Sequence, residues 1–188
     1  MTTHRTTAPA HSSAEPATDP PVDARLLARG LAAVRIVLGF TFLSNGLAKL
    51  FGFHEVAFGP VVGNLINRGD ARFILDVEVN KNARHLLPLI KRITNDVVLP
   101  HFGLFGWALT VVELTAGLLL VLGLLPRLGA LINLGPIVFL FFVYLSNDRW
   151  LPEQVIELVP LLVLAAVPSG YVWGLDGRLG RRPARWPL

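Results

Sequence analysis

Five polar side chains stand out because they lie inside long apolar stretches: Arg35, Asn45, Lys49, Glu113 and Glu157. Glu113 is the most unusual, since it lies near the middle of an apolar run from residue 102 to residue 124. As a helix, this run would be roughly 34 Å long, which exceeds the ~30 Å hydrocarbon core of a bilayer. A charged side chain at the centre of a bilayer costs at least ~2.5 kcal/mol. An acid at this depth therefore needs a partner, a proton or a function.

The depth of each residue along antiparallel helices predicts which polar groups meet. Glu113 falls between Arg35 and Asn45 in height, within reach of a long arginine. Glu157 falls near the height of Asn45 and Lys49. We therefore predict two polar contacts inside a helical bundle, Arg35–Glu113 and Lys49–Glu157, with Asn45 between them. Glu113, Arg35 and Lys49 are the candidate catalytic residues. Asn45 and Glu157 are the candidate substrate-binding residues.

Each of these residues also has a structural interpretation. Arg35 and Lys49 could extend their charged ends to the two membrane interfaces, as long basic side chains near helix ends do at little cost. Glu113 could be a protonated or paired acid that fixes the register of the helices. Glu157 lies nearer water, which favours a structural role for it more than for Glu113.

The remaining polar residues of the apolar stretches are interpreted as structural. His54 and His101 flank the outer ends of the first two apolar runs, and no third ligand is evident, so no metal site is predicted. Asn133 and Asn147 are interpreted as packing or capping residues.

The composition indicates a membrane protein. The chain has 188 residues, of which 53% are hydrophobic and only 16% are charged, whereas soluble domains average ~25% charged residues. The net charge is +4, but much of the excess lies just past the last apolar run, at Arg178, Arg181, Arg182 and Arg185. This distribution is typical of the cytoplasmic flank of a membrane helix and argues against a nucleic-acid partner. The chain has no cysteine, which excludes disulfides, thiolate catalysis and Cys-ligated metals within it.

Four apolar runs predict an all-α integral membrane bundle with four antiparallel helices. The predicted spans are residues 30–51, 102–124, 128–146 and 151–172. The links after the second and third spans are short, which favours antiparallel neighbours. The distribution of Lys and Arg predicts that both termini are cytoplasmic and that the loop 52–100 is outside.

Three further segments complete the predicted organisation. Residues 1–23 are rich in Thr, Ala, Pro and Ser and are predicted to be a disordered tail. The membrane domain then covers residues 24–180, and residues 181–188 form a basic cytoplasmic tail. Within the outer loop, the mildly amphipathic segments Gly59–Asn67 and Leu86–Leu99 predict one or two short helices on the membrane surface or over the bundle.

The first apolar run carries a face suited to close helix packing. Arg35, Phe42 and Lys49 are spaced by seven residues, and Gly39 and Gly46 share that spacing. Residues spaced by seven lie on nearly one face of a helix. Small residues on such a face allow two helices to approach closely in lipid.

Three motifs resemble those of the DoxX family. The first run reads Arg35-x3-Gly39-x2-Phe42-x3-Gly46-x2-Lys49-Leu50-Phe51-Gly52, similar to the first helix of that family. The second run and its hinge, Glu113-Leu114-x2-Gly117-Leu118-Leu119-Leu120-x2-Gly123-Leu124-Leu125-x-Arg127, resemble the second helix, and Gly174-Leu175-Asp176-Gly177-Arg178 resembles the tail. The resemblance covers about residues 26–180. The long first loop and Val98-x-Pro100 look more like the DoxD-type branch, which includes the membrane subunit of thiosulfate:quinone oxidoreductase.

The resemblance implies a four-helix bundle in the bacterial cytoplasmic membrane, associated with quinone-linked thiosulfate oxidation or with resistance to oxidative stress. Arg35, Lys49 and Glu113 match the intramembrane polar positions of the family. No covalently bound cofactor is expected, and a quinone is the expected non-covalent one. Since the chain lacks cysteine, any sulfur chemistry would involve the substrate, a quinone or another subunit, which leaves an independent enzyme activity undecided.

Three functions remain open from the sequence. The first is a redox-linked membrane subunit, in which a quinone or small sulfur compound binds near Glu113 while Arg35 and Lys49 hold an anion. The second is a non-catalytic scaffold that docks a protein partner through its outer loop, since a large loop offers a docking surface. The third is a small transporter, for which Pro136 and Pro160 provide sites where helices could break.

Overall fold

The computed structural model describes residues 24–82, 87–145, 147 and 151–180, without the side chains of Phe58 and of residues 151–154. The predicted disordered tail and basic tail both lie outside the described residues. Within them the protein is all-α apart from one small hairpin, as predicted.

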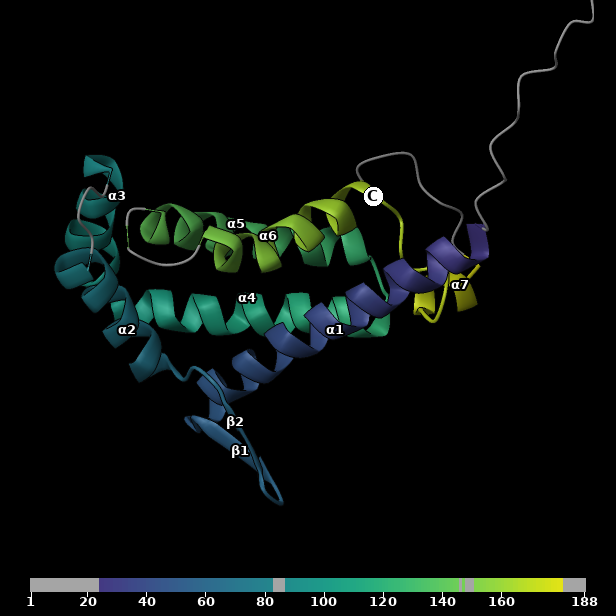
Figure 1. Cartoon of the computed structure of the whole chain (residues 1–188), viewed down its shortest axis with the longest axis horizontal. Helices are drawn as coiled ribbons and strands as arrows, with labels where there is room; N and C mark the ends of the chain where they lie inside the picture. Colours follow the sequence, from purple (N-terminus) through teal and green to yellow (C-terminus); the bar gives the residue numbers. More distant parts are fainter. Residues whose placement is uncertain (1–23, 83–86, 146, 148–150, 181–188) are drawn as a thin grey trace, which may run out of the picture.

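Four apolar helices form the body of the protein (Figure 1). They are α1 (Ala24–Phe51), α4 (Phe102–Leu122), α5 (Pro126–Tyr144) and α6 (Leu151–Ala166). The first three are long and apolar enough to cross a membrane. The fourth has 16 residues, or about 24 Å, and ends at Ala166 rather than near residue 172.

The helices α4, α5 and α6 run lengthwise beside one another, and α1 crosses α4 obliquely (Figure 1). Their outer faces carry large exposed apolar side chains, which suits contact with lipid. Examples are Val37, Phe40, Leu104, Val111, Leu118 and Ile156. These features identify a multi-pass membrane protein.

A sharp turn separates α4 from α5. Gly123 ends α4 with φ of 62°, and Leu125 follows with φ of 48°. A left-handed residue after a helix satisfies its last carbonyl groups, and glycine adopts this conformation without steric strain. Pro126 then occupies the first turn of α5, where its missing N–H is tolerated. The turn therefore brings α5 back antiparallel to α4.

The outer loop is built differently from the prediction. Residues 59–67 form a turn, the strand β2 (Val61–Asn64) and a short link, and β2 pairs with β1 (Glu55–Phe58) as an antiparallel hairpin. The prediction of a helix there was wrong, because Gly59 adopts a positive φ of 59° that favours a turn. The helical prediction for residues 86–99 is confirmed within the described residues by α3 (Pro88–Ile93) and the π-helical turn η2 (Thr94–Val98).

The helix α2 (Arg68–Val77) begins at a capping box and continues into a second π-helical turn, η1 (Glu78–Asn82). The Asn67 side chain accepts a hydrogen bond from the Asp70 N–H, and the Asp70 carboxylate accepts one from the Asn67 N–H. This reciprocal pattern satisfies two backbone donors and fixes the start of the helix. Figure 1 places α2 and α3 at one end of the bundle, whereas α7 (Leu175–Arg178) lies at the other end.

Candidate functional site

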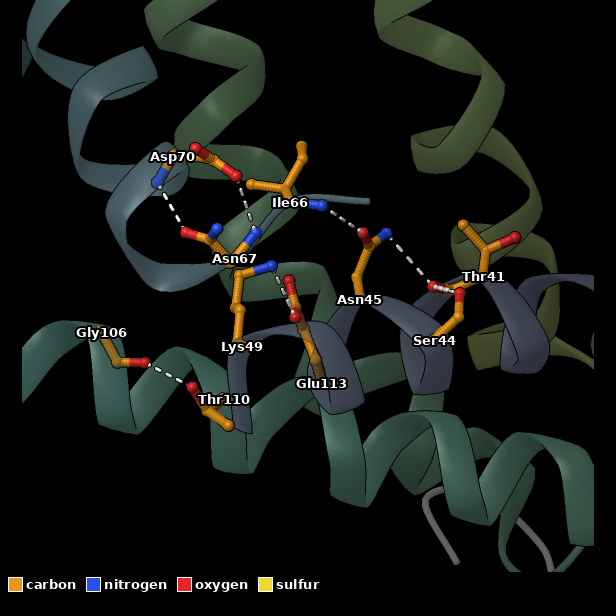
Figure 2. Close-up of polar contacts among 10 residues, drawn as sticks. All are labelled: Thr41, Ser44, Asn45, Lys49, Ile66, Asn67, Asp70, Gly106, Thr110 and Glu113. Carbon is orange, nitrogen blue, oxygen red and sulfur yellow. Dashed lines mark hydrogen bonds and ion pairs between the residues drawn. The ribbon is translucent and has the colours of Figure 1, made fainter. Parts of the chain in front are cut away.

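An ion pair joins α1 to α4 in the interior of the apolar bundle. Lys49 Nζ lies 2.9 Å from Glu113 Oε2, and the two side chains are only 3% and 13% exposed. Figure 2 shows them pointing toward each other from the two helices. Burial removes hydration from both charged groups, and their mutual attraction offsets part of that cost.

Small residues bring the two helices close enough for this pair to form. A Cβ added to Gly117 would lie 2.5 Å from the backbone nitrogen of Leu43, and one added to Gly46 would lie 2.9 Å from the backbone nitrogen of Leu114. A Cβ on Gly39 would lie 2.7 Å from the nitrogen of Val121. The prediction that Gly39 and Gly46 allow close packing is confirmed, and Gly117 is their counterpart on α4.

These glycine contacts also explain why the predicted pairing of Arg35 with Glu113 was wrong. The contacts set an antiparallel register that differs from the predicted one by about two helical turns, or about 10 Å. The prediction assumed that α1 starts at residue 30, but the helix starts at Ala24 and reaches the middle of α4 near its own end. Lys49, two heptads beyond Arg35, therefore faces Glu113.

Glu157 on α6 completes the charges of the site. It lies close enough to interact electrostatically with both Lys49 and Glu113. The predicted Lys49–Glu157 proximity is thus present as an electrostatic interaction, whereas the direct ion pair of Lys49 is with Glu113. The Lys49 ammonium group is thus in direct contact with the Glu113 carboxyl group and interacts electrostatically with that of Glu157. The three groups carry excess negative charge when both carboxyl groups are ionised, and a single proton neutralises it.

Asn45 connects the site to the outer loop. Its Oδ1 accepts a hydrogen bond from the Ile66 N–H at 3.2 Å, and its Nδ2 donates to the Thr41 carbonyl at 3.2 Å. Figure 2 shows the Asn67–Asp70 capping box just beyond this contact. Asn45 lies one helical turn from Lys49. It therefore positions the start of α2 beside the ion pair.

Arg35 belongs to a separate cluster at the opposite end of α1. It is fully buried, and it donates hydrogen bonds to the carbonyl oxygens of Ser169 at 2.6 Å and Trp173 at 3.0 Å. Asp176 interacts with it electrostatically. Fourteen residues of helix separate Arg35 from Lys49, or about 21 Å. Arg35 is therefore not part of the Lys49–Glu113 site.

The Arg35 cluster closes the end of the bundle that contains the α4–α5 turn. The Asp176 N–H donates to the Gly123 carbonyl at 3.2 Å, and the Asp176 carboxylate accepts from the Leu125 N–H at 3.1 Å. A Cβ on Gly123 would collide with the Arg35 guanidinium, and one on Gly174 would collide with the Gly170 carbonyl. The segment after α6 is thus fastened to α1 and to the turn.

Two further polar residues are buried on α4 and α5; sequence reasoning missed Thr110 and interpreted Asn133 as a packing or capping residue. Thr110, one turn before Glu113, is fully buried and donates to the Gly106 carbonyl at 2.8 Å. Asn133 on α5 is 1% exposed. The signal that could have indicated Asn133 is its position on the same helical face as Gly129 and Ala130, both of which are small and suit a buried face.

Among the described residues, His54 and His101 lie outside these clusters. His54 is exposed, and His101 contacts the Val97 carbonyl through Nδ1 at 3.0 Å. Across the described ranges, no group of three or more His, Asp or Glu residues could hold a metal ion.

The comparison with protein families gives one match. Residues 79–145 match the family model described as DoxX. The match includes Glu113 and Asn133, and it leaves out α1 with Lys49 and α6 with Glu157. No curated protein and no solved structure matches the chain. The family match agrees with the resemblance carried by the helix-two motif and supports a DoxX-like membrane protein.

Proposed function

We propose that this DoxX-like membrane protein is a redox-associated subunit of a bacterial cytoplasmic membrane, and that the Lys49–Glu113 pair is its proton-handling site. The single observation that carries the proposal is the burial of this ion pair between two apolar helices, with the second carboxyl group of Glu157 in electrostatic reach. Ionisable groups inside a membrane are costly, and they commonly mark proton relays or substrate sites.

The charges of the site suit proton exchange. Lys49 can balance only one of the two carboxyl groups, so a proton on Glu113 or Glu157 keeps the site neutral. Binding of an anion beside Lys49 would favour uptake of that proton, and its departure would favour release. Such coupling requires no cysteine in this chain.

The residues present also fit a quinone or a small sulfur anion as the bound group. Lys49 offers a buried cation, and Glu113 offers a carboxyl group that can donate or accept a proton. A bound quinone would supply the electron-accepting chemistry. The chain's own residues would bind and orient it, exclude water and exchange the proton at the Glu113 carboxyl group.

A second function, docking of a protein partner, is favoured by the shape of the outer loop. The hairpin projects away from the helices (Figure 1), and all four residues of β2 are exposed. Val61 and Val62 are 66% and 57% exposed on it. A short strand with free backbone groups can pair with an extended segment of another protein.

Mass spectrometry of the protein purified mildly from its native membrane tests both functions in one sample. The redox proposal predicts a stoichiometric quinone or small sulfur anion that is lost in Glu113→Gln. The matched control is Glu55→Gln, an acid of the outer hairpin that lies outside the site. A preparation that carries a constant protein partner and no such small molecule would reject the redox proposal in favour of docking.

A further inference from the structure

The β1–β2 hairpin has an apolar tip that is exposed on both faces. Residues 57–62 at this tip read AFGPVV and contain no ionisable group, whereas Glu55 and Asn64 pair opposite each other at the base. All four residues of β2 are exposed. Val61 and Val62 are consecutive, so their side chains point to opposite faces of the hairpin. Water is therefore an unfavourable environment for either face of this tip.

The packing of α1 on α4 sets the level at which the hairpin leaves the bundle. A Cβ added to Gly46 would lie 2.9 Å from the backbone nitrogen of Leu114, so these two residues lie at the same level. In this antiparallel register Phe51, the last residue of α1, lies at about the level of Leu109. The start of α4 at Phe102 is seven residues, or about 10 Å, further along the bundle. The hairpin therefore starts beside α4, and Figure 1 shows it projecting sideways there, whereas α2 lies nearer the end of α4.

A tryptophan and an arginine mark this level as a membrane interface. Trp107 on α4 is 48% exposed, and the Arg68 guanidinium carbon lies 3.8 Å from the centre of its ring. Tryptophan is enriched where hydrocarbon meets headgroups, and an arginine can stack on its ring while keeping its charge in the headgroup layer. Trp107 is two residues from Leu109 along α4. The hairpin therefore leaves the bundle close to the boundary between acyl chains and headgroups.

We propose that the β1–β2 hairpin is a membrane anchor, and that its tip, residues 57–62, inserts among the lipid acyl chains at this boundary. The lipid-facing surface of the bundle continues into the hairpin, because Phe51, where α1 ends, is 72% exposed. The insertion is shallow, since among the described residues the two strands pair only with each other, and their outer backbone groups need water or headgroups as partners. The anchor is independent of the redox proposal.

Lipid accounts for the two exposed faces better than a protein partner does. A partner that extends the sheet from β2 contacts one edge of the hairpin and leaves its two apolar faces uncovered. Acyl chains surround the tip and cover both faces. The absence of an ionisable group in residues 57–62 also fits insertion, because a charge among acyl chains would be costly.

Spin labels on the full-length protein in phosphatidylcholine vesicles test the anchor. The chain has no cysteine, so Val61→Cys and Val62→Cys each provide one labelling site, on opposite faces of the hairpin. The measurement compares how often each nitroxide collides with oxygen, which concentrates in hydrocarbon, and with a nickel complex, which stays in water. We expect oxygen collisions to exceed nickel collisions at both positions. Ala57→Cys, opposite Val62 on β1, replaces Val62→Cys if that variant does not fold.

Two positions calibrate the measurement. Val111→Cys is the lipid control, because Val111 lies on α4 and is 58% exposed, compared with 57% for Val62. Lys91→Cys on α3 is the water control, because Lys91 is exposed and charged. The labels at Val61 and Val62 should resemble the label at Val111 and differ from the label at Lys91.

Two outcomes would overturn the anchor. Nickel collisions that exceed oxygen collisions at either valine, as at Lys91, would place that face in water and reject insertion of the tip. Protection of either label from both reagents would show that protein covers that face, which in a purified preparation means a second copy of this chain. Neither outcome concerns Lys49 or Glu113, so the redox proposal is tested separately.

Discussion

Two buried basic side chains on the same face of α1, one near each end, have different kinds of partner. Lys49 meets a carboxylate on α4, with a second acid nearby, and the Asn45 side chain beside it accepts one hydrogen bond from the Ile66 N–H, just before the start of α2. Arg35 meets two backbone carbonyl groups and lies under a segment tied to the α4–α5 turn by further hydrogen bonds. A spacing of seven residues placed both on one face, but the partners decide their roles.

The comparison shows why each end uses its own basic residue. The planar guanidinium of Arg35 presents several fixed donors and keeps its charge, which suits the fastening of carbonyl groups. The ammonium of Lys49 is compact, and it pairs with an acid that can itself take a proton. The Arg35 end is therefore interpreted as a structural closure, and the Lys49 end as the chemically active part.

The largest expected effect is the loss of stability when the buried hydrogen bonds of Arg35 are removed. Arg35→Met leaves the Ser169 and Trp173 carbonyl groups without their donor and Asp176 without its nearby cation, which should destabilise the protein by about 3–5 kcal/mol. We expect a strong decrease in the unfolding temperature measured in detergent. Arg35→Lys should restore only part of it, because one ammonium cannot reproduce the two-carbonyl geometry. A fully stable Arg35→Met variant would contradict the structural role.

A smaller loss of stability is expected at the Lys49 end of α1. Lys49→Met should destabilise the protein by about 2–3 kcal/mol, because Glu113 loses its charged partner. The double variant Lys49→Met with Glu113→Leu should recover most of that stability but should bind no quinone. A thermal-unfolding cycle of the single and double variants measures the coupling energy. Recovery of both stability and binding in the double variant would show that the pair is structural, like Arg35.

The apolar helices were predictable from the sequence, but the register of α1 relative to α4 was not. The apolar runs and their lengths indicated the spans, because a bilayer sets the length of a crossing helix. The register depends on which small residues of α1 meet which residues of α4, and a single chain pattern does not specify this. Gly39 and Gly46 were recognised as a packing face, yet Gly117 was not recognised as the small residue of α4 that packs against α1, so Arg35 was paired with the wrong acid.

The hairpin and the unpartnered amide of Asn133 were not predicted, for other reasons. The hairpin is short and exposed, so its strands lack the alternating burial that makes strands recognisable in a sequence. Asn133 was interpreted as a packing residue because one asparagine in an apolar run has no local signal. The burial of its Nδ2 without a hydrogen-bond acceptor among the described residues is a property of the folded bundle.

The register itself can be tested at Gly117. Gly117→Ala places a methyl group against the Leu43 backbone, which cannot move independently of its helix. The expected destabilisation is about 1–3 kcal/mol, with a longer distance between Lys49 and Glu113 and weaker quinone binding. Gly30→Ala in α1 is the control, since a Cβ there meets no atom within 4 Å. It should be neutral or slightly stabilising, because alanine favours a helix. Equal stability of the two variants would refute the close contact of α1 with α4.

The smallest expected effect on stability is at Asn45, and it distinguishes the Lys49 end of α1 from the Arg35 end. Asn45→Ala removes the acceptor for the Ile66 N–H and should destabilise the protein by about 1 kcal/mol. Hydrogen exchange should become faster at Ile66 and at the start of α2, whereas the Asp176 N–H at the other end should keep its protection. Ser44→Ala is the matched control, because Ser44 donates only to Thr41 within α1. If exchange at Ile66 is the same in both variants, then Asn45 does not hold the loop, and the start of α2 is positioned by its own capping box and its packing on α4.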